Sequence, residues 1–295
     1  MRRLGAIVRA TALEILSEPL SLLVLLAALT MSVLAPAFHY HQFGEATRMA
    51  RDAGFSALLL CGGIVSVFGT VRAFRREVES GTLSMALVHS VSRAGFFLAK
   101  TAGALVAVLV FSAIVLSVAM TIVEGASVGG RLAAASGDIA RLWGPCLAAG
   151  VGVMVLPLVF GAALNRFAGC RFVLSFFAVA GCLAALCFGW TAFRDGSLVL
   201  RLLPAALPIV VLSVVLMSAA AAFSVRLKAN AASAAVGGAV VLLVPAVGNY
   251  YLSNALSGGG AVTWGYVGLA GLAAVPVIVF FVLLGIHFMD KCDIS

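Results

Sequence analysis

The sequence predicts an all-α membrane protein, a polytopic helical bundle with 6–8 transmembrane helices. Of its 295 residues, 63% are hydrophobic and only 10% are charged, whereas soluble domains average about 45–50% apolar and about 25% charged residues. The apolar residues also gather into runs of about 20, the length that a helix needs to span a bilayer. Only short polar loops separate the runs, so we expect residues 1–295 to form a single transmembrane domain.

Eight apolar runs are candidates for membrane-spanning helices. Six crossings are also possible, because the sixth and seventh runs could be partly re-entrant, or the short loop after the fourth could join two half-helices. The approximate limits of the eight runs are 20–38, 55–71, 98–122, 143–164, 172–192, 205–223, 234–252 and 264–288.

The basic residues predict the orientation of the chain. If the N-terminus is cytoplasmic and eight crossings follow, about two thirds of the 19 Lys and Arg residues lie on the cytoplasmic side. Cytoplasmic loops of membrane proteins carry such an excess of positive charge. We therefore expect both termini in the cytoplasm. A basic inner surface facing anionic membrane lipid also explains the net charge of +8, with no nucleic-acid partner.

The sequence contains no credible catalytic set and no motif of a metal site. Its six cysteines form no Cys-x-x-Cys pair, so we expect small buried side chains rather than disulfides or metal ligands. The phosphate-binding loop Gly-x-x-x-x-Gly-Lys-Ser/Thr and His-Glu-x-x-His are missing. Gly125-Ala126-Ser127-Val128-Gly129 matches Gly-x-Ser-x-Gly in its letters, but no credible catalytic set accompanies it. We expect no catalytic residue and no cofactor in this chain, so that energy for any work comes from another polypeptide.

Ionisable side chains are scarce within the apolar runs. Glu124 and His287 occur only at the ends of runs. Carboxylates, basic groups and histidines inside a membrane usually mark ion paths or proton relays. Their scarcity counts against a proton- or sodium-coupled transporter.

The densest cluster of charge lies between the second and third runs, in residues 72–97. Arg72 to Glu79 read as the polar end of a helix that leaves the bilayer, and Ser80-Gly81-Thr82 as a break. A short amphipathic helix is expected over 83–89, and Ser90-Val91-Ser92-Arg93 is expected to form a second break and cap. Arg93 and Lys100 then meet the lipid headgroups. The alternative is an interfacial helix that only anchors a loop.

This stretch resembles the signature of the ABC-2 type permeases, the membrane subunits of one class of ATP-binding-cassette exporters. The matching residues are Glu77-x-Glu79-Ser80-Gly81-Thr82-Leu83, then Ser92-Arg93 and Lys100, in order and spacing. Residues 14–20 resemble the family's amphipathic N-terminal entry, which implies an interfacial helix over about 3–18. Residues 287–294 resemble its C-terminal end, with Lys291 in place of several arginines. The resemblance is clear over about 1–125, and eight runs depart from the usual six helices.

The resemblance implies a site, partners and a location. Residues 83–89 would be a coupling helix that inserts into a cytoplasmic ATPase subunit, which holds ATP and Mg²⁺. A second permease chain, identical or a paralogue, would complete an export pathway in the bacterial inner membrane. The residues that would contact the ATPase are Arg75, Arg76, Glu77, Glu79, Gly81, Thr82, Leu83, Leu87, Ser92 and Arg93.

A substrate pathway would run between the two permease chains. Met31, Phe38, Phe55 and Phe68 are its candidate lining, which favours a hydrophobic or amphiphilic cargo. The alternative is that these side chains only pack against lipid and neighbouring helices.

Two other functions compete with the permease hypothesis. One is a non-transporting membrane scaffold that recruits a cytoplasmic factor through residues 72–97. The other is a secondary transporter, which the scarcity of intramembrane charge disfavours.

Overall fold

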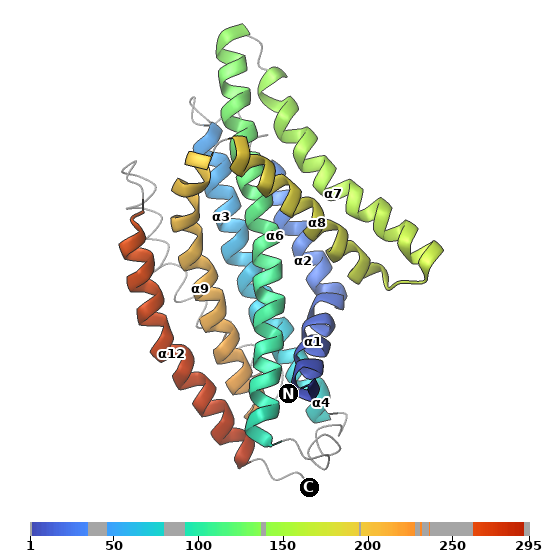
Figure 1. Cartoon of the computed structure of the whole chain (residues 1–295), viewed down its shortest axis with the longest axis vertical. Helices are drawn as coiled ribbons and strands as arrows, with labels where there is room; N and C mark the ends of the chain where they lie inside the picture. The colour runs from blue at the N-terminus through green and yellow to red at the C-terminus, as the bar shows by residue number, and fades with distance from the viewer. Residues whose placement is uncertain are drawn as a thin grey trace. The chain divides into compact units, whose positions relative to one another are not determined.

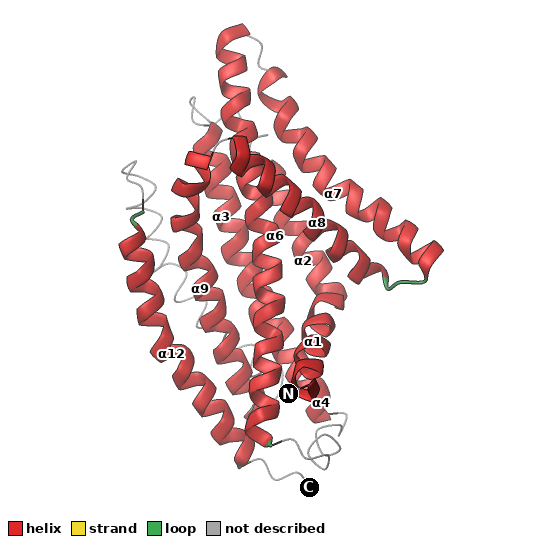
Figure 2. Cartoon of the chain, viewed as in Figure 1, coloured by secondary structure: helices red, strands yellow, loops and turns green. Residues whose placement is uncertain are grey.

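The computed structural model describes residues 2–34, 46–79, 92–136, 140–194, 196–227, 231, 236 and 262–291, without the side chains of 2, 3, 46, 77–79, 128–151 and 196–200. All regular structure in these ranges is helical, as the prediction of an all-α fold requires (Figure 2). The helices, labelled as in Figure 1, are α1 (Arg2–Ser17), α2 (Pro19–Leu34), α3 (Ala46–Ile64), the π-helix η3 (Val65–Gly69), α4 (Thr70–Glu79), α6 (Arg93–Ser136), α7 (Ala140–Ala168), α8 (Phe172–Arg194), α9 (Gly196–Arg226) and α12 (Trp264–Asp290).

Five stretches of the described chain are long and apolar enough to cross a membrane, and a sixth is added if α1 and α2 count as one broken span. The five are Thr47–Arg76, Arg93–Ser127, Phe172–Arg194, Arg201–Arg226 and Trp264–Asp290. Helix α7 contains a shorter apolar stretch, Gly152–Ala168. The predicted run 234–252 lies outside the described residues except for Val236. A helical membrane bundle with five or six spans is therefore supported.

Three helices extend well beyond the apolar runs that predicted them. Helix α6 has 44 residues against the predicted 98–122, α7 has 29 residues against 143–164, and α9 has 31 residues against 205–223. At 1.5 Å per residue, α6 measures about 66 Å, twice the roughly 30 Å of a hydrocarbon core. Hydropathy marks only the part of a helix that suits lipid, so it underestimates helices that continue into water.

The helices form two compact units, and α6 and α9 contribute to both. Unit 1 contains Met1–Glu18, Gly63–Leu109 and Val210–Ser295, and unit 2 contains Pro19–Gly62 and Val110–Ile209. In unit 2, the turn between α7 and α8 contains Gly169, whose φ of 64° favours glycine. Gly161 brings α7 close to α8, since a Cβ there would lie 3.3 Å from the backbone nitrogen of Phe176.

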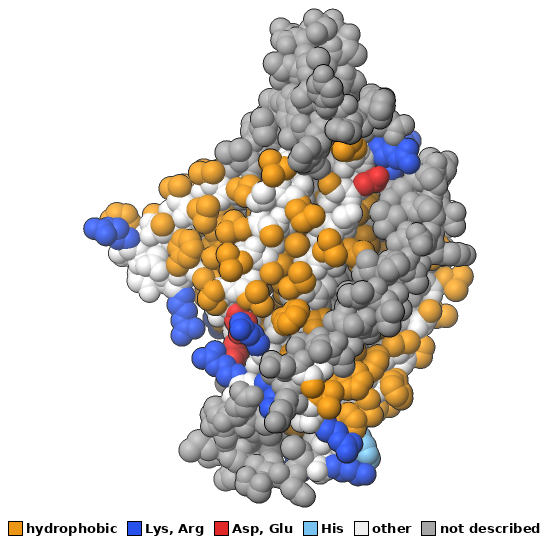
Figure 3. Space-filling model, turned by 180° about the vertical axis from the view of Figure 1, so that it is seen from behind, with side chains coloured by type: hydrophobic (Ala, Val, Ile, Leu, Met, Phe, Trp, Pro, Cys, Tyr) orange, Lys and Arg blue, Asp and Glu red, His pale blue; other side chains and the backbone are white. Residues whose placement is uncertain are grey.

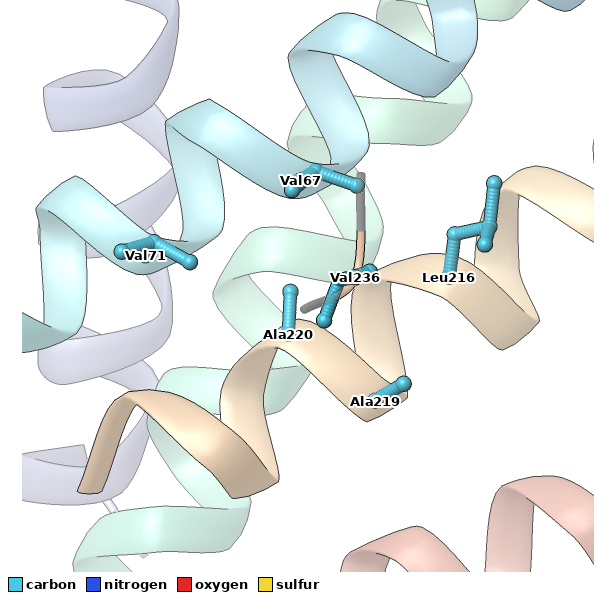
Figure 4. Packing of buried hydrophobic residues seen from close by; sticks show 6 residues of the cluster. All are labelled: Val67, Val71, Leu216, Ala219, Ala220 and Val236. Atoms are coloured by element: carbon cyan, nitrogen blue, oxygen red, sulfur yellow. The ribbon is translucent and has the colours of Figure 1, made fainter. Parts of the chain in front are cut away.

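In unit 1, a cluster of buried side chains joins η3 and α4 to α9. It consists of Val67, Val71, Leu216, Ala219, Ala220 and Val236 (Figure 4). Glycine permits close packing of α1 on α6, because a Cβ on Gly103 would lie 2.6 Å from the carbonyl oxygen of Val8. Helix α1 is consequently half in the core, with Ile15 only 1% exposed.

Helix α12 and the C-terminal half of α9 run in the same direction. Phe223 stacks on Phe281 with ring centroids 6.1 Å apart, and Arg226 lies 5.4 Å from the ring of Phe288. Residue numbers therefore increase in the same direction along both helices, which makes them parallel. The C-terminal end of α9 and the N-terminal end of α12 thus lie at opposite ends of this helix pair.

We expect Ala231 and Val262 to lie on opposite sides of the membrane. In a cysteine-free background, a membrane-impermeant maleimide should label Ala231→Cys from the same side as Ser92→Cys, because α9 ends beside the start of α6. It should label Val262→Cys from the other side. Labelling of all three from one side would contradict the parallel arrangement.

Candidate functional site

The start of α6 and the end of α4 are the described parts of the predicted coupling region. The Oγ of Ser92 accepts a hydrogen bond of 3.1 Å from the backbone N–H of Gly95, and its carbonyl accepts one of 2.9 Å from Phe96. This is the geometry of a helix N-cap, in which a serine satisfies a backbone donor of the first turn. The sequence predicted a cap in residues 90–93, and the structure identifies Ser92 as the capping residue.

Both helix ends pack into one buried cluster of unit 1, which we call the anchor cluster. Phe74 of α4 contacts Phe97 of α6, with ring centroids 5.4 Å apart. The C-terminal parts of α9 and α12 complete the packing, and Gly285 of α12 leaves room for the Phe97 ring, which a Cβ would overlap. The anchor cluster consists of Phe74, Phe96, Phe97, Lys100, Ala221, Val225 and Met289.

Lys100 is the charged member of the anchor cluster, and its side chain is fully buried. Its Nζ lies 5.3 Å from the ring centroid of Phe74 and 5.8 Å from that of Phe96. An ammonium over two aromatic faces is a cation–π arrangement, which contributes about 0.5–2 kcal/mol depending on desolvation. The prediction that Lys100 meets the lipid headgroups is wrong, because its four-carbon stem points into the packing between α4 and α6.

Arg93 fastens the start of α6 to the end of α12. Its Nη1 donates hydrogen bonds of 3.3 Å to the carbonyl oxygen of Met289 and 3.2 Å to that of Asp290. The last carbonyls of a helix lack partners within the helix and carry its negative dipole end, so a guanidinium is well suited to them. Arg93 therefore caps the C-terminal end of α12.

Two ion pairs join the end of α1 and the residue that follows it to α4. Arg76 Nη1 lies 3.6 Å from the carboxylate of Glu14, and Arg72 Nη1 lies 3.5 Å from that of Glu18. The arginine side chains are 73% and 59% exposed, so each pair contributes little to stability, about 0–1 kcal/mol. The pairs fix how α1 lies along α4 and leave both guanidiniums accessible.

The predicted ATPase-contact residues fall into three groups. Arg76, Ser92 and Arg93 have the contacts given above, and Arg75 is half-buried. Glu77 and Glu79 belong to α4, but their side chains lie outside the described residues. Also outside them are the predicted coupling helix 83–89 and, by residue, Gly81, Thr82, Leu83 and Leu87.

The candidate pathway residues are distributed over both units. Met31 and Phe55 belong to unit 2, with Met31 43% exposed and Phe55 buried, and Phe68 in η3 of unit 1 is 41% exposed. Phe38 lies outside the described residues. The described candidate residues of the pathway therefore do not all belong to one unit.

Glu124 is the acidic side chain that is most deeply buried among those described, and it lies in unit 2. Its carboxylate is 3.7 Å from Nε of Arg194, the last residue of α8. Both residues lie at the ends of candidate spans, as predicted for Glu124. Among the described side chains, no group of three or more His, Cys, Asp or Glu residues could hold a metal ion.

Sequence reasoning missed three features of this region, namely the burial of Lys100, the pairing of α1 with α4, and the capping of α12 by Arg93. The acidic residues 14 and 18 and the basic residues 72 and 76 share a spacing of four, which could have suggested two matching helix faces. No signal in the sequence identifies Arg93 as a partner of residues almost 200 positions away.

No family model matches this sequence, and no curated protein or solved structure matches it at a significant level. The resemblance to the ABC-2 type permeases therefore depends on its motif residues alone.

We expect Lys100→Ala to destabilise the protein by about 2–4 kcal/mol, because it removes a buried four-carbon stem and a cation held between two rings. The matched control is Lys291→Ala, since Lys291 is exposed at the end of α12. Thermal unfolding in detergent measures both. Equal melting temperatures for the two variants would contradict the role assigned to Lys100.

Proposed function

We propose that this chain is the permease subunit of an ABC-2 type transporter, a membrane protein driven by a separate cytoplasmic ATPase. The observation that carries the proposal is the anchor cluster. The described residues of the permease-like motif lie at the end of α4 and the start of α6, and Phe74 and Phe97 pack these two ends against each other. The two helix ends that flank residues 80–91 therefore lie together in unit 1.

These contacts could transmit a conformational change from the coupling region to the membrane helices. Lys100 and Phe97 connect α4 to α6, and Arg93 connects α6 to α12. A partner that binds residues 80–91 would thus act on three apolar helices at once. Helix α6 continues as one helix from Arg93 to Ser136, far beyond the cluster. A ligand can shift a conformational equilibrium only through different affinities for the two states, and closure of two ATPases around ATP would supply that difference.

The charges around the connection support a protein partner. Arg72 and Arg76 pair with α1 but stay mostly exposed, so they could contact acidic groups of an ATPase without breaking the core. Closely placed charges of this kind give specificity and fast association more than affinity. Arg93, in contrast, acts inside the chain and would position the start of α6.

The remaining parts of the proposal follow from the family resemblance. A second permease chain, identical or a paralogue, would form the other half of the pathway, ATP and Mg²⁺ would bind to the ATPase, and the complex would export its substrate across the bacterial inner membrane. Both termini would be cytoplasmic, on the side of the anchor cluster.

Purification of the tagged chain from its native host tests the proposal. We expect an ATPase subunit to co-purify in stoichiometric amount in mild detergent, identified by mass spectrometry. Thr82→Pro and Glu79→Arg should each reduce its recovery at least tenfold, because they alter the predicted coupling region. Arg171→Glu, a charge reversal at the exposed turn before α8, should not.

Two results would contradict the proposal. One is recovery of the chain without any ATPase under conditions that preserve other membrane complexes. The other is an ATPase that stays bound to the Thr82→Pro and Glu79→Arg variants as well as to the control. A cytoplasmic partner without ATPase activity would favour the scaffold instead.

A further inference from the structure

We propose that the C-terminal ends of α9 and α12 form a binding surface for an anionic phospholipid. The surface consists of an exposed apolar stripe on α12 that ends in a group of basic side chains. It does not depend on the proposed function, and Arg93 is the residue that it shares with the predicted coupling region.

The apolar stripe follows one side of α12. Leu272, Phe280 and Leu283 are 75%, 59% and 60% exposed, and the spacing of three, four and seven residues places Phe280, Leu283 and His287 on one face. From Leu272 to Leu283 the helix rises about 16 Å, close to the roughly 15 Å of one hydrocarbon leaflet. In a bilayer these exposed apolar side chains face the hydrocarbon core, where an acyl chain can lie along them.

Basic side chains gather where the stripe ends. The guanidinium of Arg226 lies 5.4 Å from the ring of Phe288. His287 and Lys291 are exposed and one turn apart, and Lys291 is also one turn beyond Phe288. Figure 3 shows basic side chains and a histidine directly beside a band of hydrophobic side chains.

The net charge of this group is positive. Arg93 lies next to it, bound to the carbonyl oxygens of Met289 and Asp290. Asp290 is exposed and is the acidic side chain that α12 contributes here. Three permanent cations and one carboxylate leave an excess of positive charge, which complements a lipid phosphate and an anionic headgroup.

A lipid explains the combination better than a soluble protein does. Charge alone would suit either partner, but the apolar stripe continues from the basic group over a leaflet's depth. Long basic side chains at helix ends extend toward the headgroups while their stems stay on apolar surface. The basic group would thus bind the headgroup of a phospholipid, and the apolar stripe would contact its acyl chain.

Local fluorescence quenching in the full-length chain tests this site. Trp143, Trp190 and Trp264 are replaced by Phe, and Leu283→Trp places one fluorophore on the stripe. Quenching by brominated phosphatidylglycerol is compared with quenching by brominated phosphatidylcholine in mixed bilayers. We expect the anionic lipid to be preferred at this position.

The variant Arg226→Gln/Lys291→Gln should lower that preference by roughly 25-fold, since each basic side chain near an anionic surface contributes about fivefold. The control Arg166→Gln/Arg171→Gln removes the same charge from the end of α7 and the turn before α8, and it should leave the preference unchanged. Both pairs are exposed in the fold, and gel filtration verifies that each variant is intact.

Three results would overturn the proposal. They are equal quenching by the two lipids in the parent protein, a preference that survives Arg226→Gln/Lys291→Gln, and an equal loss in the control. If the anionic lipid is not preferred but the double variant loses a co-purifying ATPase, the surface binds a protein and not a lipid.

Discussion

Burial of the Lys100 ammonium is the constraint on which the rest of unit 1 depends. A cation moved out of water costs several kcal/mol unless nearby groups stabilise it. Here the rings of Phe74 and Phe96 face the ammonium from α4 and α6. Separating the two helices at this level would remove the Phe74 ring from the cation and lose this stabilisation. The lysine thus favours packing of the end of α4 on the start of α6.

The other contacts of unit 1 extend this packing. Arg93 adds the end of α12 by binding its last carbonyls, and Gly285 lets Phe97 approach the same helix. Glu14 and Glu18 place α1 along α4 through accessible arginines. The stronger contacts are therefore buried and the weaker ones lie outside, so a partner could exchange the outer ion pairs and leave the core intact. This division suits the proposed coupling to an ATPase.

Composition and apolar runs predict the helical membrane fold well, because lipid requires every backbone group to be satisfied within a helix. The cap at Ser92 is also predictable, since it is local chemistry. Burial of Lys100 is not, because a lysine near the start of an apolar run reads as interfacial, and only the approach of Phe74 from another helix shows otherwise. The same holds for Arg93 and Asp290, which are distant in sequence. The lengths of α6 and α7 exceed their apolar runs for a different reason, namely that helices continue where hydropathy falls.

Hydrogen–deuterium exchange on the full-length protein tests most directly whether the anchor cluster unites these helices. The comparison is between the parent protein and Phe97→Ala, which empties the centre of the cluster. Our account predicts faster exchange together in the last turn of α4, the first turns of α6 and the last turn of α12, with α8 of unit 2 unchanged. Faster exchange confined to α6 would show that the three helices are not held as one body and would contradict the account.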